Sequence, residues 1–465
     1  MFDYSSAILI VALLLGLVLL GVHVGIALGV TSALGIYMAT GKLRIVEAML
    51  ASTAAEALRD FTFAVIPLFM LMGEFIGRSG AITDIYIAIN KGLSRIPARL
   101  AIATVLGNTI FSFVTGVSIA SAAAFSRIAY PEMKFHRYDR GFALGAIACS
   151  SCLGMLIPPS VLLIVWGILT EQSIGRLFLA GVLPGLVLAF MFILYVVASA
   201  LIWPEKVGER RRDDHAAAAE PAADGAAGAG SGNGPLLPMD STRAALPPGR
   251  ALGSFLGVGF IVAAVLGGIW NGLFTPTEGA GAGAALALLL AFAKGMSPRG
   301  MIAAIYSVGK TAAPILILLL LAALYSRTLA MTGVTTAIRS FFETSGLEPW
   351  QILAVIVLIW FVLGMVIDSI SIILLTVPIV EPVAQAFGFD RMSFAIIGII
   401  AIEAGLLTPP FGLLVYTVKA AIEDEEVGVQ RIFLSSVPYW AIMLLAVLLL
   451  VAFPQLANYL PDRLM

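Results

Sequence analysis

The chain has 465 residues, of which 60% are hydrophobic and only 12% are charged, and its formal net charge is −1. Soluble globular proteins carry about 25% charged residues, so this composition excludes an ordinary soluble domain. Together with a mean hydropathy of +1.02, it indicates a membrane protein, and no basic tract suggests nucleic-acid binding.

Long apolar segments predict membrane-spanning helices, because lipid cannot satisfy the hydrogen bonds of exposed backbone groups. In the first half, full spans are predicted at about 6–22, 24–40, 62–78, 141–168 and 177–202. In the second half, they are predicted at about 252–270, 275–294, 312–330, 392–421 and 433–453. Shorter amphipathic stretches predict interfacial helices at 43–60, 80–95 and 333–346.

Two further apolar segments, 98–134 and 349–385, are interrupted near their middles. We predict that each is a re-entrant hairpin of two half-depth helices, with one tip near Thr115–Ser118 and the other between Gly364 and Ser371. The predicted fold is therefore an all-α polytopic membrane protein with about ten full spans and two re-entrant hairpins.

The chain repeats one pattern twice at a constant offset. The first copy reads Tyr138-Asp139-Arg140, Gly154 and Leu156-Ile157-Pro158-Pro159, and the second reads Phe389-Asp390-Arg391, Gly405 and Leu407-Thr408-Pro409-Pro410. Helix breaks at corresponding positions of two halves are typical of the central site of a transporter. The predicted domains are a first repeat at 1–203, a disordered cytoplasmic linker rich in Ala, Gly and Pro at 204–250, and a second repeat at 251–465.

Five full spans per half, an odd number, invert the second repeat relative to the first. The positive-inside rule favours a cytoplasmic linker, because the base of the first hairpin then lies in the cytoplasm with Arg95, Arg99 and Lys134. The base of the second hairpin holds few basic residues besides Arg391, and it is then outside together with both termini. The basic segment 42–60 fits this topology least well.

Cys149 and Cys152 allow two interpretations, a metal or redox pair or two small side chains that pack on one helix face. Metal sites usually need further ligands, and the three histidines lie elsewhere in the sequence, so packing is favoured. No H-E-x-x-H, G-x-S-x-G or phosphate-loop motif occurs, so we expect no ATPase or hydrolase chemistry and a protein that is not an enzyme.

The first hairpin and the helix after it could build a cation site. Ser112 and Thr115 are three residues apart, so both hydroxyls lie on one helix face. Gly154 and Ile157-Pro158-Pro159 interrupt the following helix, and a proline frees carbonyl groups one turn earlier. Hydroxyls and freed carbonyls form an oxygen cage that suits sodium. The alternative is ordinary Ser/Thr back-bonding beside a proline kink.

The second half offers a similar set with fewer polar side chains. Thr408 would supply a side-chain oxygen, whereas Gly364, Gly405 and Phe411 would supply carbonyls around Pro409-Pro410. This prediction depends on the repeat alone.

Two acids lie in apolar segments of the second half, and such acids are functional candidates because an isolated charge is costly there. Asp368, beside Ser369 and Ser371, could orient a substrate, neutralise an ion or cap the second helix of its hairpin. Glu403 could carry a proton or pair with a buried basic group.

At these residues the chain resembles the large membrane subunit of tripartite ATP-independent periplasmic (TRAP) transporters, the DctM-like family. The match is strongest from Gly116 to Pro184, and it includes Ile128-Ala129-Tyr130-Pro131-Glu132-Met133, Leu156-Ile157-Pro158-Pro159-Ser160 and Phe178-Leu179-Ala180-Gly181. In the second half it includes Phe274-Thr275-Pro276-Thr277-Glu278, Asp368 and Leu407-Thr408-Pro409-Pro410. The first tip departs from the pattern, since it reads Thr-Gly-Val-Ser where the family more often has Ser-Gly-Ser-Ser.

The resemblance implies an elevator-type secondary transporter of the bacterial inner membrane, surrounded by lipid, that imports organic acids with a carboxylate and is driven by sodium ions. It also implies a small four-helix membrane subunit, expected as a separate chain, and a periplasmic substrate-binding protein. The family's two sodium sites carry over to Ser112, Thr115, Gly154, Ile157 and Pro159 for sodium 1, and to Gly364, Gly405, Thr408 and Phe411 for sodium 2. Ser118, Asp368 and Ser369 at the hairpin tips are the predicted substrate contacts.

Two alternatives remain at this stage. One is a stand-alone ion-coupled anion transporter of similar fold, driven by protons through Glu403. The other is an intramembrane enzyme that uses Asp368 and Glu403 as an acid pair, although no nucleophile or metal set accompanies them.

Overall fold

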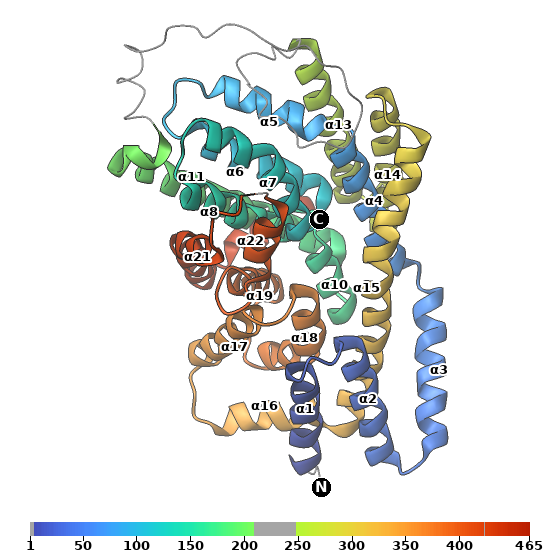
Figure 1. Ribbon diagram of the computed structural model, residues 1–465. Helices are drawn as coiled ribbons and strands as arrows, with labels where there is room; N and C mark the ends of the chain where they lie inside the picture. Colours follow the sequence, from blue (N-terminus) through green and yellow to red (C-terminus); the bar gives the residue numbers. More distant parts are fainter. Residues whose placement is uncertain (1–3, 209–247, 423) are drawn as a thin grey trace, which may run out of the picture.

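The computed structural model describes residues 4–208, 248–422 and 424–465, and the regular elements in these ranges are all helices (Figure 1). The first half comprises α1 (Tyr4–Leu19), α2 (Val24–Thr40), α3 (Leu43–Arg59), η1 (Phe61–Ala64), α4 (Val65–Arg78), α5 (Ala81–Gly92), α6 (Arg99–Thr115), α7 (Ser118–Phe135), α8 (Arg140–Ser151), α9 (Leu153–Leu156), α10 (Val161–Thr170), α11 (Ile174–Ile202) and η2 (Pro204–Val207). The second half comprises α13 (Pro248–Trp270), α14 (Pro276–Ala293), α15 (Pro298–Thr332), α16 (Val334–Thr344), α17 (Pro349–Gly364), α18 (Ser369–Ala386), α19 (Arg391–Gly405), α20 (Leu413–Ala421), α21 (Val429–Ala452) and α22 (Gln455–Leu464). The all-α prediction is confirmed.

Eight helices of the described chain are long and apolar enough to cross a membrane. The helices at the predicted spans 6–22 and 24–40 are shorter, with 16 residues in α1 and 17 in α2. The predicted span 392–421 is divided between α19, with 15 residues, and α20, with 9, whereas α18, predicted as a half-depth hairpin arm, is one of the eight. The three predicted interfacial helices coincide with α3, α5 and α16 within a few residues. Most of the predicted linker, residues 209–247, lies outside the described residues.

Two elements differ from the predictions. Helix α15 was expected at 312–330 but begins at Pro298, because Ser297 caps it by accepting a hydrogen bond from the Gly300 N–H at 3.1 Å. Pro314 inside α15 does not end the helix. The C-terminal helix α22 was not predicted, since its sequence is short and polar compared with the spans.

Both interrupted segments form helical hairpins, as predicted, and they enter the molecule from opposite ends. In Figure 1 the first hairpin, α6 and α7, lies beside α5 near one end, whereas the second, α17 and α18, lies beside α16 at the other. At the first tip Gly116 adopts φ +64°, a left-handed conformation that favours glycine. The two halves thus repeat the same order of elements in inverted orientation.

The halves interlock because the second arm of each hairpin packs against the short helix after the Pro-Pro break of the other half. Helix α7 contacts α20, and α18 contacts α10. Near the second contact, Trp166 of α10, Trp360 of α17 and Phe394 of α19 are buried against one another, with ring centroids 5.2 to 6.0 Å apart. Such aromatic pairs add stabilisation beyond their buried area, so this cluster fixes the centre of the bundle.

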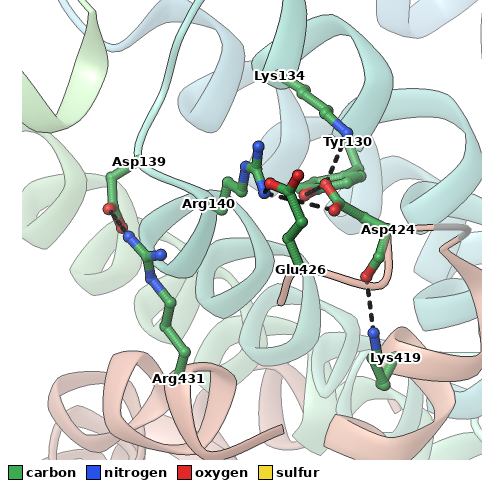
Figure 2. A network of polar contacts seen from close by, with 8 residues as sticks. All are labelled: Tyr130, Lys134, Asp139, Arg140, Lys419, Asp424, Glu426 and Arg431. Carbon is green, nitrogen blue, oxygen red and sulfur yellow. Dashed lines mark hydrogen bonds and ion pairs between the residues drawn. The ribbon is translucent and has the colours of Figure 1, made fainter. Parts of the chain in front are cut away.

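A polar network joins the base of the first hairpin to the second half (Figure 2). Asp424, in the loop between α20 and α21, contacts Lys134 at 2.7 Å, and its carboxylate accepts a hydrogen bond from the Tyr130 hydroxyl at 2.7 Å. Arg140, at the start of α8, lies 3.4 Å from the same carboxylate and 2.5 Å from Glu426. The repeated Tyr-Asp-Arg pattern therefore supplies one side of a contact between halves.

The second copy of the pattern does the same at the other end. Arg391 lies 3.0 Å from Glu381 and donates to the Thr170 carbonyl at 2.8 Å, which reaches the end of α10 in the first half. The acid of each copy is a helix cap, since Asp139 accepts from the Phe142 N–H at 2.8 Å and Asp390 accepts from the Ser393 N–H at 2.7 Å. The pattern thus starts a helix and anchors it to the other half.

The network around Asp424 makes the stability of the fold depend on pH. Burial by itself would raise the pKa of Asp424, but hydrogen bonds from Lys134 and Tyr130 and the positive charges of Lys134 and Arg140 lower this pKa to about 2. An unfolded aspartate has a pKa of about 3.9. The carboxylate therefore stabilises the fold fully above about pH 4, and this contribution is lost as pH falls through about 2.

We expect Asp424→Asn to lower the free energy of unfolding at neutral pH by roughly 1–3 kcal/mol, because Lys134 and Arg140 lose their shared buried partner. Thermal unfolding in detergent, followed between about pH 7 and pH 2, measures both effects. The wild type should lose more stability than the variant on acidification. Glu426→Gln, at an exposed position, is the control and should change stability by less than about 0.5 kcal/mol. Equal acid sensitivity in wild type and Asp424→Asn would contradict this assignment.

Candidate functional site

The two hairpin tips meet at the centre of the molecule around one pocket. Helices α4 and α15 close the pocket on the side away from the tips. The lining residues are Met70, Val117, Ser118, Ile119, Met155, Val161, Thr311, Ile315, Asp368, Ser369, Ile370, Leu406, Leu413 and Leu414. All three predicted substrate contacts, Ser118, Asp368 and Ser369, are among them.

The first tip packs directly on the break of the helix that follows it. A Cβ atom at Gly116 would lie 2.1 Å from the Pro159 carbonyl oxygen, and the Gly116 carbonyl accepts a hydrogen bond from the Val161 N–H at 3.1 Å. A Cβ atom at Gly154 would lie 3.2 Å from Ser121 Oγ and 3.3 Å from the backbone of the tip. The structure thus places the tip that contains Thr115 beside Gly154 and Pro159.

The hydroxyls proposed for cation binding all donate to the backbone carbonyl four residues earlier in the chain. Ser112 Oγ donates to the Asn108 carbonyl at 2.6 Å, and Thr115 Oγ1 donates to the Phe111 carbonyl at 2.9 Å. In the second half, Thr408 Oγ1 donates to the Ala404 carbonyl at 3.0 Å. Back-bonding, the alternative reading, therefore occurs. It uses the single proton of each hydroxyl and leaves the oxygen lone pairs free to face a cation.

The second tip meets its helix break through an even closer backbone contact. A Cβ atom at Gly405 would lie 2.3 Å from the Phe361 carbonyl oxygen, and one at Gly364 would lie 2.6 Å from the Ile402 carbonyl oxygen. Glycine is therefore required at both positions. Beyond the break, the Phe411 N–H donates to the Met365 carbonyl at 3.1 Å, and the Thr408 N–H donates to the Gly405 carbonyl at 2.9 Å. The four residues predicted for sodium 2 therefore lie close together at this break.

Asp368 caps α18, the second helix of its hairpin, which is one of the three roles predicted for it. Its Oδ1 accepts a hydrogen bond from the Ser371 N–H at 3.0 Å. The side chain is only half-buried and also lines the pocket, so the cap and a role toward a ligand are compatible.

Glu403 is buried directly behind the second tip. Its Oε1 accepts a hydrogen bond from Ser369 Oγ at 2.6 Å, and its backbone carbonyl lies 3.8 Å from Cys152 Sγ. Among the described residues, Oε2 has no hydrogen-bond partner and no basic side chain forms an ion pair with this carboxyl group. The predicted alternative, in which Glu403 pairs with a buried basic group, is therefore not found among the described residues.

Two features of the pocket were missed from sequence. Met70, Thr311 and Ile315 line it from helices outside the hairpins, and no local pattern distinguishes them from ordinary helix residues. The second feature, the contact between Cys152 and Glu403 behind the pocket, had a signal in the sequence. The repeat offset of 251 residues relates these two residues, as it also relates Ser118 to Ser369. Both cysteines are buried free thiols, as the packing interpretation expected.

Comparisons with known proteins agree with this architecture. The C4-dicarboxylate TRAP transporter large permease protein DctM of Pseudomonas aeruginosa is 29% identical over 414 residues, which cover 88% of each chain. The ectoine TRAP transporter large permease protein TeaC of Halomonas elongata is 29% identical and covers 98% of each chain. The sialic acid TRAP transporter large permease protein SiaM of Vibrio cholerae is 26% identical and covers 96% of each.

Among solved structures, the YdaH transporter of Alcanivorax borkumensis matches 90% of both chains with a TM-score of 0.62. At 13% identity this likeness shows the fold alone. The family model of the tripartite ATP-independent periplasmic transporter, DctM component, matches residues 11–456. With a match over nearly its whole length, the chain belongs to the DctM family of TRAP transporter large membrane subunits.

Proposed function

We propose that this chain is the large membrane subunit of a sodium-coupled TRAP transporter that imports an organic acid with a carboxylate group. The observation that carries the proposal is the central pocket, where both hairpin tips meet beside the two Pro-Pro breaks. Discontinuous helices that meet at mid-depth are the usual substrate and ion sites of secondary transporters.

The electrostatics of the pocket favour an anion accompanied by cations. Helix α7 begins at Ser118 and α18 begins at Ser369, and both residues line the pocket. A helix N-terminus carries a partial positive charge and unpaired N–H groups, which suits a carboxylate. Sodium ions held by the hydroxyl and carbonyl oxygens beside the tips would add positive charge near the substrate. Asp368 at the same pocket would oppose a carboxylate that arrives without its ions.

The sodium ligands that we propose are those that the family resemblance implies. Sodium 1 would be held by Ser112, Thr115, Gly154, Ile157 and Pro159, and sodium 2 by Gly364, Gly405, Thr408 and Phe411. Support for sodium 1 comes from the contact of the first tip with Pro159, together with hydroxyl oxygens whose protons are already donated. Support for sodium 2 comes from the Gly364–Gly405 contact, which leaves no room for side chains between carbonyl groups.

Transport by an elevator movement fits the arrangement of the helices. The hairpins, α8 to α10, α19 and α20 interlock as one body around the tryptophan cluster. Helices α2, α4, α14 and α15 pack on one another and would form a scaffold beside this body. The pocket lies between the two groups, so sliding of the body along α15 would carry a ligand at the tips across the membrane.

The partners and location proposed are those of the family. We propose a bacterial inner-membrane location, a separate small four-helix membrane subunit and a periplasmic binding protein that delivers the substrate. Two relatives are named for C4-dicarboxylates and sialic acid, which carry carboxylates. A stand-alone, proton-coupled anion transporter is the second candidate, favoured only by Glu403, whose carboxyl has no basic partner among the described residues.

In proteoliposomes that contain both membrane subunits, we expect uptake of a carboxylate substrate only when an inward sodium gradient and the loaded binding protein are both present. The reason is that ion binding at the tips must accompany the anion. Radiolabelled uptake with sodium replaced by potassium measures the coupling. Uptake driven by a proton gradient without binding protein would instead establish the second candidate.

We expect Thr115→Val to raise the sodium concentration for half-maximal uptake by about tenfold, because one oxygen ligand is lost while the side-chain volume is kept. The matched control is Thr109→Val on the same helix. Both threonines are 6% exposed and both donate to a carbonyl one turn earlier. Sodium dependence of uptake measures the effect, and equal shifts in the two variants would refute a ligand role for Thr115.

A further inference from the structure

Glu403 occupies the point where the two repeats face each other. Its equivalent in the first repeat is Cys152, 251 residues earlier, and the Cys152 thiol lies 3.8 Å from the Glu403 carbonyl. Contact between equivalent residues of two inverted repeats means that the pseudo-two-fold axis passes close to them. One repeat thus places a carboxylic acid near this axis, whereas the other places a small thiol.

Side chains from both hairpin tips face this acid. Ser369, the first residue of α18, donates its hydroxyl proton to Glu403 Oε1 at 2.6 Å. Ser118, the first residue of α7 and the equivalent of Ser369, also lies next to the Glu403 carboxyl group. The start of each hairpin's second arm is therefore placed against one side chain of α19.

The same residue is adjacent to both proposed sodium sites. Gly405 of sodium 2 follows Glu403 by two residues on α19, and a Cβ atom at Gly405 would collide with the second hairpin. Gly154 of sodium 1 follows Cys152 by two residues, and it packs against the first tip beside Ser118. A shift of either tip would therefore disturb the contacts of Glu403 or of its repeat equivalent Cys152.

We propose that Glu403 is a positioning residue that couples the two sodium sites by holding both hairpin tips against the broken helices. This inference rests on the proposed sodium coupling, and it assigns no direct contact between Glu403 and an ion. Coupling requires that occupation of one site favours the arrangement that the other site binds. The Ser369–Glu403 hydrogen bond supplies such a link, because it is buried and fixes the second tip relative to the helix that carries Gly405.

If Glu403 acts by accepting the hydrogen bond from Ser369, substitutions that keep this bond and substitutions that remove it should behave differently. Glutamine keeps an acceptor oxygen of the same reach, so Glu403→Gln preserves the bond from Ser369 and should retain wild-type behaviour within about twofold. Glu403→Ala removes the acceptor and leaves the Ser369 hydroxyl unpaired, and Ser369→Ala removes the donor. We expect both alanine variants to raise the half-saturating sodium concentration by about tenfold. We also expect them to lower the Hill coefficient for sodium from above 1 in the wild type to about 1.

The experiment is sodium-dependent uptake by the complete transporter in proteoliposomes, paired with sodium-dependent thermal stabilisation of the purified chain in detergent. Both the half-saturating concentration and the Hill coefficient are independent of how much protein is folded, so a purely structural role would leave them unchanged. Ser371→Ala, at a buried position two residues further along α18, is the matched control and should behave as wild type.

The possible outcomes test the proposed sodium coupling and the role of Glu403 separately. Wild-type uptake and melting that ignore sodium would refute the proposed sodium coupling and this inference with it. A sodium-dependent wild type with unchanged Hill coefficient and half-saturation in Ser369→Ala would overturn the role of Glu403 alone. Glu403→Gln that behaves like Glu403→Ala would also overturn it, since the charge rather than the hydrogen bond would then matter. If Glu403→Ala does not fold, the Ser369→Ala and Glu403→Gln arms still decide.

Discussion

The whole arrangement depends on how backbone groups are satisfied where helices stop in the middle of an apolar bundle. An unpaired peptide group away from water costs several kcal/mol, so a helix can break at this depth only where another segment supplies partners. Here the Val161 N–H donates to the Gly116 carbonyl, and the Phe411 N–H donates to the Met365 carbonyl, each at 3.1 Å. Each hairpin tip therefore completes the broken helix beside it, and the two tips meet at one pocket.

The hydrogen bonds between tips and breaks are not the only contacts that hold the hairpins in place. Packing of the hairpin helices against the other half also restrains them. The second arm of each hairpin lies against the short helix of the other half, so neither half can form its centre alone. Arg140 and Arg391, equivalent residues of the repeat, secure the two ends of this interlock with acids and carbonyls. Arg140 and Arg391 lie at the starts of α8 and α19, and the aromatic cluster of Trp166, Trp360 and Phe394 lies in the apolar interior, so the costly charges are kept out of it.

Features set by local chemistry were predictable from sequence, and features set by distant partners were not. Hairpins, helix breaks and the capping residue Asp368 follow from glycine, proline and short polar side chains at particular positions, and the structure has them there. The Ser369–Glu403 bond and the contacts of Asp424 join residues that no period or spacing connects. The start of α15 was misplaced because Ser297-Pro298 is a strong cap in front of a stretch too polar to suggest a span.

The repeat also shows why its two halves are not interchangeable. Backbone geometry is shared, but the acids of the central region are confined to the second half: Asp368 stands where the first tip has Val117, and Glu403 stands where the first broken helix has Cys152. Conversely, two hydroxyls on α6 lie where the second hairpin has apolar residues. The two helix breaks thus share their backbone geometry but carry unequal side chains. If the chain transports as proposed, the shared backbone geometry would allow the pocket to open to either side with similar packing, whereas a single asymmetric ligand would require side chains that differ across the axis. Under the proposed transport function, the duplicated breaks would serve alternating access, and the departures from the repeat would determine what is bound.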